Sequence, residues 1–253
     1  MKVKVIKIGG KLIEDDRTLG EVCKRLKACY PNCIVVHGGG NMATALAASL
    51  GVENRMHDGR RITDKAMLDI AVMVYAGFAN KKIVAELLKN DVNACGLSGC
   101  DMGLVIAEKR ESEEIDWGFV GDIKKINAEV FTQMLKDKIM PVISPISCTV
   151  EGQLLNTNAD NVASSVAIAL SGKFEVELVY CFDKAGVLED INDETSVIAE
   201  INLQKYTDLK KNNRIHSGML PKLENAFKTL EAGVDVVRIT NYQHLDGGST
   251  VIK

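Results

Sequence analysis

Short apolar segments alternate with amphipathic segments of helical period along most of this 253-residue chain. Residues 3–8 and 33–37 are apolar and have the length of buried strands. Residues 18–28 and 64–77 repeat apolar side chains at intervals of three and four, as the core face of a helix does. Strands that alternate with helices favour crossover connections and parallel pairing. The pattern therefore predicts an α/β fold, a three-layer αβα sandwich with a mainly parallel central sheet.

The alternation continues to the end of the chain, with a weak change in composition near residue 172. After this point the alternation restarts, which predicts an N-terminal lobe (1–172) and a C-terminal lobe (173–253). We expect further helices at 41–50, 80–90, 128–136, 158–170, 203–210 and 220–232, and further strands at 92–95, 139–144, 177–182, 235–240 and 249–252. Residues 149–155 should form two short strands around a turn. Residues 104–107 and 117–126 should form a hairpin around a solvated loop, Glu108–Asp116.

The charge balance argues against a nucleic-acid partner. Thirty-one Lys and Arg residues face 34 Asp and Glu residues, a formal net charge of -3, without the concentrated basic footprint of a nucleic-acid binder. No apolar stretch has the length of a membrane-spanning helix, and the N-terminus lacks the apolar core of a signal peptide. The seven cysteines, with no CxxC pair, are typical of reduced thiols. We therefore predict a cytoplasmic protein without nucleic-acid or membrane partners.

Lys7 stands late in the first apolar strand and is followed by Gly9 and Gly10. In open α/β sheets, ligands bind beyond the carboxyl ends of the strands. Glycines at that position let a ligand approach backbone N–H groups closely. Lys7 is therefore either the cation of a phosphate site or a lysine whose ammonium group extends from the sheet to solvent. The strand alone leaves both interpretations open.

A second glycine run, Gly38–Gly40, connects the second strand to a helix. The N-terminus of a helix attracts anions through its unpaired N–H groups and its dipole. With Ala43 the run also matches the dinucleotide fingerprint G-x-G-x-x-A, but three consecutive glycines satisfy that pattern by chance and follow the second strand rather than the first. We interpret His37, just before the run, as a hydrogen-bonded structural residue rather than a catalytic base.

Two further polar motifs open helices. Four of the six residues 156–161 have carboxylate or amide side chains, more than one helix cap requires. An aspartate in this motif could hold lysines in position by charge pairing. The segment Gly218–Lys222 opens a helix with Pro221 in its first turn. Lys222 is either a solvated surface charge or a phosphate ligand contributed by the far lobe.

In this order the motifs resemble those of the amino-acid kinase superfamily, and within it the N-acetylglutamate kinases, over essentially the whole chain. The most specific match is Gly59–Thr63, followed by the helical segment 68–77 and by Asn80-Lys81. Residues 156–160 resemble the family's Asn-x-Asn-Ala-Asp motif, and residues 218–222 resemble its Gly-Met-x-x-Lys motif.

The resemblance implies transfer of the γ-phosphoryl group of MgATP to the side-chain carboxylate of N-acetyl-L-glutamate, giving N-acetylglutamyl 5-phosphate in the second step of arginine biosynthesis. An anionic donor meets an anionic acceptor, so catalysis depends on alignment and charge stabilisation. The resemblance assigns Lys7 to the transferring phosphoryl group, Lys222 to the leaving side and Asp160 to organising both lysines. It implies no protein-held metal, because Mg²⁺ arrives with ATP.

The resemblance also assigns residues to the two substrates, with the acylated amino acid in the N-terminal lobe and ATP in the C-terminal lobe. Arg61 would clamp the α-carboxylate with two parallel hydrogen bonds. Gly10 and Gly39 would donate backbone N–H bonds to phosphoryl oxygens. The expected acyl-amino-acid ligands are Gly39, Gly40, Arg61 and Asn156, and the expected phosphate or ATP ligands are Gly9, Gly10, Gly38, Asp183, Gly186, Gly218 and Met219.

Differences from the family pattern leave the acyl group open. Met56-His57-Asp58 stands where more basic or apolar residues are expected, and Cys148, Cys181-Phe182 and Lys184 replace smaller or aliphatic residues. N-succinyl-L-glutamate is an alternative acceptor that needs an additional cation or donor in the pocket. The sequence also leaves open an aspartate, carbamate or nucleoside monophosphate kinase of the same superfamily, a non-catalytic sensing module and a dehydrogenase.

The resemblance also bears on assembly. Members of this family often form homodimers through the N-terminal lobe, and arginine-inhibited members carry an additional N-terminal helix. The first strand of this chain begins near residue 3. We therefore expect a homodimer without feedback inhibition by arginine.

Overall fold

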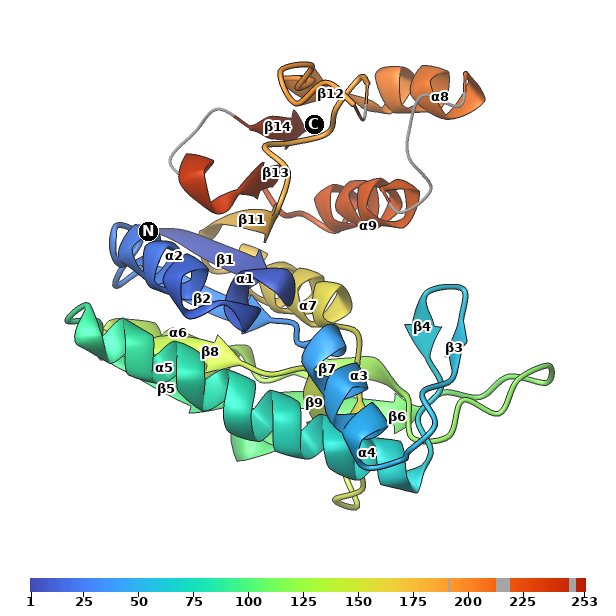
Figure 1. Ribbon diagram of the computed structural model, residues 1–253. Helices are drawn as coiled ribbons and strands as arrows, with labels where there is room; N and C mark the ends of the chain where they lie inside the picture. The colour runs from blue at the N-terminus through green and yellow to red at the C-terminus, as the bar shows by residue number, and fades with distance from the viewer. Residues whose placement is uncertain (191, 213–218, 246–248) are drawn as a thin grey trace.

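The computed structural model describes the chain except for residues 191, 213–218 and 246–248. Over the described residues, eight strands form the central sheet, and every neighbouring pair is parallel except β13 with β14. The predicted α/β fold with a mainly parallel sheet is confirmed (Figure 1). In order across the sheet, the strands are β12 (Glu200–Ile201), β14 (Thr250–Ile252), β13 (Val236–Asn241), β11 (Glu175–Phe182), β1 (Lys2–Ile8), β2 (Cys33–His37), β8 (Met140–Ile143) and β5 (Ala94–Leu97).

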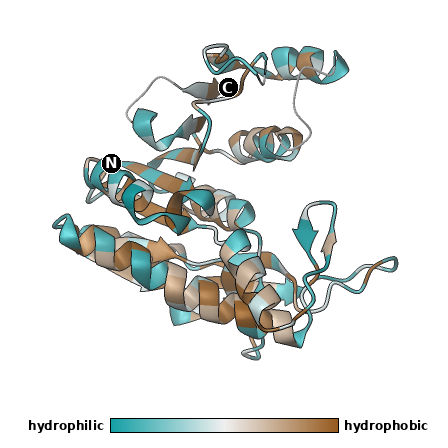
Figure 2. Cartoon of the chain, viewed as in Figure 1, coloured by the Kyte–Doolittle hydropathy of each residue, from teal (hydrophilic) through white to brown (hydrophobic). Residues whose placement is uncertain are grey.

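Helices cover both faces of this sheet, because its strands alternate apolar side chains toward two separate cores. In β1, Val3 and Val5 belong to one core, whereas Ile6 and Ile8 belong to the other. Figure 2 shows hydrophobic residues along the strands of the central sheet, whereas the helices carry both hydrophobic and hydrophilic residues. The first core is covered by α6 (Ala128–Lys136), α7 (Ala159–Ser171), α8 (Leu203–Lys211) and α9 (Leu220–Glu231), and the second by α1 (Lys11–Glu14), α2 (Asp16–Lys27) and α5 (Asn80–Lys89).

A second sheet of four strands is formed by segments between residues 105 and 156, within the predicted N-terminal lobe, and contains the predicted hairpin. Its β6 and β7 pair antiparallel, as expected. The turn at residues 149–153 also joins two short antiparallel strands, as predicted, but the first of them, residues 146–148, precedes the predicted range. In order across this sheet, the strands are β10 (Leu154–Asn156), β9 (Ile146–Cys148), β6 (Val105–Lys109) and β7 (Gly121–Ile126).

Several elements differ from the sequence prediction. The two predicted helices at 64–77 and 80–90 form one continuous rod: α4 (Lys65–Ala71), a π-helical segment η1 (Val72–Ala79) and α5. The sequence analysis missed a small hairpin of β3 (Met56–His57) and β4 (Arg60–Arg61). Asp58 and Gly59 form its turn with φ values of 46° and 72°, which suits a two-residue hairpin turn. The sequence analysis also missed two single-turn elements, η2 (Asp101–Gly103) and η3 (Tyr242–His244), whereas α3 (Gly40–Ser49) agrees with the helix predicted at 41–50.

The two predicted lobes share the central sheet. β1 lies beside β2 on one side and pairs along its full length with β11 on the other. The boundary near residue 172 therefore falls between two strands that belong to the same sheet, and the functional division between the lobes stays a prediction. Within the described residues, no helix is both long and apolar enough to cross a membrane.

Candidate active site

Three charged residues predicted from separate motifs meet beyond the carboxyl end of β1. Lys7 lies late in that strand, Asp160 is the second residue of α7, and Lys222 lies in the first turn of α9. The Lys7 Nζ lies 2.8 Å from Asp160 Oδ1, and the Lys222 Nζ donates a 3.0 Å hydrogen bond to Oδ2. One carboxylate therefore holds an ammonium group from each half of the chain.

The charge of this cluster follows from its contacts. Burial disfavours the Asp160 carboxylate, but attraction to Lys7 and Lys222 outweighs that effect and lowers its pKa from 3.8 to about 2. Asp160 is therefore ionised at neutral pH. The three side chains are between 15% and 27% exposed, so they remain accessible to a ligand. Two ammonium groups and one carboxylate leave a net charge of +1 that can meet an anionic ligand.

The two predicted glycine loops lie directly against each other. A Cβ atom on Gly10 would stand 3.1 Å from Gly39 N, and one on Gly38 would stand 3.2 Å from Gly10 N. Gly39 itself has φ 156° and ψ 16°, and its Cβ would meet the Tyr75 ring at 3.0 Å. Side chains at these positions would push the loops apart, which explains why the sequence has glycine here.

The glycine N–H groups divide into two sets. Gly9 donates to the Cys181 carbonyl (2.9 Å) and Gly38 donates to the Ile8 carbonyl (3.1 Å), so both bonds extend the sheet. In the described part of the chain, the N–H groups of Gly10 and Gly39 have no recorded acceptor. The predicted phosphate contacts through backbone N–H groups therefore fit Gly10 and Gly39 better than Gly9 and Gly38.

A pocket of about 210 Å³ lies beside these loops. The glycine run 38–40 forms one wall, and residues 156–159, which directly precede Asp160, form another. The remaining described lining residues are Met56, Gly59, Arg60, Arg61, Tyr75, Arg110, Val120 and Pro145. Four predicted substrate ligands, Gly39, Gly40, Arg61 and Asn156, thus share one pocket next to the charged cluster.

Arg61 lies in the pocket wall, but its side chain is already bonded to protein atoms. Its Nη2 donates to the Gly40 carbonyl and to Thr44 Oγ1, both at 3.0 Å, while Nη1 binds Asn54 Oδ1. A carboxylate must replace part of this set to form the predicted two-bond clamp. That role for Arg61 stays a prediction. Asn156 is buried and donates to Thr63 Oγ1 at 3.0 Å, which fixes its amide at the pocket.

The predicted nucleotide residues outside the glycine loops have separate local contacts. Asp183 accepts a hydrogen bond from Lys11 at 3.2 Å, and Lys222 lies over the Phe182 ring. Gly186 packs tightly against Thr250, which supports a structural need for glycine at that position. Gly218 lies outside the described residues, and Met219 precedes α9 directly. Contacts of these residues with a nucleotide stay predictions.

His37 and Asn80 form a buried network behind the glycine run. The His37 Nδ1 bonds to the Gly38 carbonyl (2.8 Å), and Asn80 Nδ2 donates to His37 Nε2 (3.2 Å). Burial lowers the pKa of His37 to about 4, so the imidazole is neutral. Lys81 completes the network through Asn80 Oδ1 and the Gly96 carbonyl. These contacts support the interpretation of His37 as structural.

Arg110 corrects the prediction of a solvated loop at residues 108–116. The first two residues of that stretch belong to β6, and Arg110 N continues the pairing by donating to the Val120 carbonyl. The Arg110 side chain is 14% exposed and lies against the Trp117 ring. The residue was missed because a single arginine in a polar stretch gives no sequence signal of a pocket.

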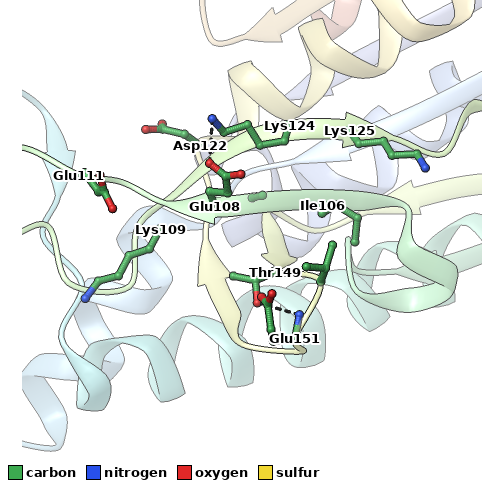
Figure 3. Close-up of a pocket in the computed structure, with 11 residues that line it drawn as sticks. Ile106, Glu108, Lys109, Glu111, Asp122, Lys124, Lys125, Thr149 and Glu151 are labelled. Carbon is green, nitrogen blue, oxygen red and sulfur yellow. Dashed lines mark hydrogen bonds and ion pairs between the residues drawn. The ribbon is translucent and has the colours of Figure 1, made fainter.

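A larger hollow of about 620 Å³ lies on the outer face of the second sheet (Figure 3). It is lined by side chains of both charges from β6 and β7, such as Glu108, Lys109 and Lys124, and by the turn at 149–151. Lys124 pairs with Glu108 at 2.9 Å within it. It shares no lining residue with the pocket at the glycine run.

Among the described residues, no group of three or more His, Cys, Asp and Glu side chains is placed to hold a metal ion. Both carboxylate oxygens of Asp160 already face ammonium groups.

Comparisons with known proteins show which family the chain belongs to. Residues 2–241 match the Amino acid kinase family. The acetylglutamate kinase of Phocaeicola vulgatus is 45% identical over 253 residues, which covers 100% of this chain and 98% of the relative. The acetylglutamate kinase of Methanopyrus kandleri is 37% identical over 256 residues, which covers 99% of this chain and 100% of the relative.

Solved structures show the same fold at low identity. The N-acetylglutamate synthase of Neisseria gonorrhoeae, complexed with coenzyme A and N-acetyl-glutamate, matches with a TM-score of 0.84 and 23% identity over 99% of this chain. The chain spans 59% of that synthase. A Giardia carbamate kinase matches with a TM-score of 0.71 and 15% identity, over 99% of this chain and 98% of its own.

Proposed function

Because the chain belongs to the amino acid kinase family, we propose that it transfers the γ-phosphoryl group of ATP to the side-chain carboxylate of N-acetyl-L-glutamate. The product is N-acetylglutamyl 5-phosphate, and the reaction is the second step of arginine biosynthesis. The observation that carries the proposal is the ion-paired cluster of Lys7, Asp160 and Lys222 beside a pocket lined by arginines. The full-length similarity to acetylglutamate kinases supports the acceptor.

The cluster fits the electrostatic demand of this reaction. A phosphoryl group carrying negative charge must approach a carboxylate. The two lysines, which come from two directions, reduce the repulsion between these two anionic groups. Lys7 lies on β1, three residues before Gly10, so it contacts the transferring group. Lys222 enters from α9 and contacts the leaving side of the nucleotide. Asp160 holds one ammonium group at each of its carboxylate oxygens. The acceptor carboxylate needs no general base because it is already a nucleophile.

Mg²⁺ is carried by the nucleotide in this proposal. The phosphate oxygens of ATP are hard ligands of the kind that Mg²⁺ prefers. Support comes from Asp160, whose oxygens are both engaged by lysines and are therefore poor candidates for a metal. We further propose a cytoplasmic location. Its support is that all seven cysteines, each among the described residues, are thiols rather than disulfides, as is usual in a reducing compartment.

The decisive assay is ATP-dependent acyl phosphate formation, trapped as the hydroxamate with hydroxylamine. N-acetylglutamate should give hydroxamate, whereas free glutamate, aspartate and carbamate should give little. The physical reason is that the pocket beside the glycine run has to be filled for the acceptor carboxylate to be aligned. Turnover of a free amino acid alone would reject the proposed acceptor while keeping the kinase.

We also propose a homodimer formed through the N-terminal half. An apolar groove of about 490 Å³ runs between α3 and η1 and is lined by Met42, Leu46, Met73 and Phe78 among others. Met73 and Phe78 are 52% and 63% exposed, which is unusual for such large side chains near a groove. A second copy related by a two-fold axis would place the same groove opposite itself and cover both.

Phe78→Glu should convert this dimer to a monomer, because a carboxylate would be buried without a partner at the centre of the contact. Sedimentation velocity would measure the mass. Leu203→Glu provides the matched control, since Leu203 is 58% exposed on α8 and lies far along the chain from the groove. A Phe78→Glu protein that sediments like the unmodified chain would reject this interface.

A further inference from the structure

The pocket at the glycine run contains more positive charge than its proposed acceptor needs. Three arginines, Arg60, Arg61 and Arg110, line it, and none of its described lining residues is acidic. N-acetylglutamate carries two carboxylates. The side-chain carboxylate has to face Lys7 for phosphoryl transfer, so only the α-carboxylate is left for the arginines. One arginine balances that charge, and the pocket retains a surplus.

Arg110 is held in place by a carboxylate and by an aromatic ring. Its Nε lies 3.1 Å from each carboxylate oxygen of Asp122, and Nη2 binds the same carboxylate. The guanidinium carbon lies over the Trp117 ring, 5.3 Å from its centroid, a favourable cation–π contact. In the described part of the chain, Nη1 has no recorded acceptor, so this end can donate to a pocket ligand. Such a stacked, paired arginine is preorganised to receive a carboxylate.

The carboxylate of Asp122 neutralises the positive charge of one of the three guanidinium groups, that of Arg110. The remaining balance near the pocket is +2, since three arginines face one carboxylate. Arg60 contributes to it from the β3–β4 hairpin, where its side chain is exposed and has no recorded partner among the described residues. An α-carboxylate together with a second carboxylate would balance this charge, whereas an α-carboxylate with a methyl group would not.

We propose that the preferred acceptor has an acyl group ending in its own carboxylate, a dicarboxylic acyl chain such as that of N-succinyl-L-glutamate, and that Arg110 binds this terminal carboxylate. The inference rests on the proposed function and refines its acceptor. The acyl chain extends from the glycine run toward the second sheet, and Arg60 closes over it from the hairpin. N-acetylglutamate occupies the same pocket but leaves Arg110 without its ligand, so it is the poorer substrate.

Four acceptors test this assignment in the hydroxamate assay: the N-acetyl, N-butanoyl, N-succinamoyl and N-succinyl derivatives of glutamate. The succinamoyl chain has the size of succinyl without its charge. We expect kcat/KM for the succinyl compound to exceed that of the succinamoyl compound by about tenfold or more, as charge-assisted pairing with arginine provides. In Arg110→Gln this ratio should fall toward one.

Two variants separate binding from structural effects. Arg110→Gln with Asp122→Asn removes both charges, so no carboxylate is left unpaired, and the same loss of discrimination is expected. Lys109→Gln is the matched control: it removes a positive charge one residue away that lines the outer hollow instead (Figure 3), and the ratio should stay unchanged.

The outcomes are distinguishable. If the succinyl compound is no better than the succinamoyl compound, or if Arg110→Gln lowers kcat/KM for all acceptors equally, Arg110 has a structural role and the inference is rejected. The proposed kinase function then still stands. If no N-acylglutamate gives hydroxamate, the proposed function itself fails.

Discussion

Alanine in place of Lys7 or Lys222 is expected to lower kcat by about 100-fold or more, the scale typical of losing one preorganised group that stabilises transition-state charge. Each lysine supplies one of the two ammonium groups held by Asp160, 2.8 and 3.0 Å from its oxygens. Because the three residues act as a unit, the double variant should lose little beyond either single variant. Steady-state hydroxamate formation at saturating ATP measures the effect.

Lys24→Ala is the control for general charge loss. Lys24 is 61% exposed on α2 and pairs only with Glu21 among the described residues, so its removal should leave kcat unchanged. Thermal unfolding of each variant shows whether the fold is retained. Near-normal kcat in a folded Lys7→Ala or Lys222→Ala protein would remove that lysine from the mechanism.

Asp160→Asn should be nearly as damaging to turnover, for a different reason. The amide keeps the shape of the carboxylate but removes its charge, so the two ammonium groups repel each other and lose the acceptor that orients them. We expect kcat to fall by more than about tenfold, in line with the loss of a charge-assisted interaction. The measurement is again hydroxamate formation, with a folded protein verified by circular dichroism.

The same variant makes a prediction about acid stability. The folded-state pKa of Asp160 is about 2, below its ordinary value of 3.8. A lowered pKa means that the ionised carboxylate stabilises the fold above about pH 4, and that this contribution is lost as the pH falls toward 2. Asp160→Asn should therefore unfold at lower denaturant concentration at pH 6, and its stability should decline less between pH 4 and 2.

Asp137→Asn is the matched control, because Asp137 is an exposed carboxylate at the end of α6 that accepts hydrogen bonds from Gln133. This variant should leave the decline of stability between pH 4 and 2 almost unchanged. If the stability of Asp160→Asn declines between pH 4 and 2 as steeply as that of the unmodified protein, the carboxylate is not held by the lysines in solution.

Local sequence patterns were sufficient for most of the fold. The strand at residues 33–37 and the helix at 128–136 have the predicted bounds, since each is a strongly apolar or strongly periodic segment. The β3–β4 hairpin was missed because each strand has only two residues, although Asp58-Gly59 is a known hairpin signal. The π-helical segment had no usable signal, because its apolar residues fit an ordinary helix equally well.

The candidate site was predictable only in part. Lys7, Asp160 and Lys222 lie far apart in the chain, so only the resemblance to a known family linked them, and the structure shows the ion pairs that the resemblance implied. Arg110 depends on a single cross-strand pair with Asp122 and on stacking against Trp117. Neither contact follows from local sequence. The N–H bonds of Gly9 and Gly38 likewise depend on neighbouring strands that no motif identifies.

The central position of β1 has a consequence for synthesis of the chain. β1 is made first, and its neighbour β2 follows soon afterwards, but β11 begins only at Glu175. Until then the growing half-sheet exposes one edge of β1, the kind of unpaired edge that invites pairing with other chains. The strand that carries Lys7 therefore gains its second neighbour only after β2 and β8 have been made. The nascent chain depends on the later strand β11 to protect β1 from aggregation.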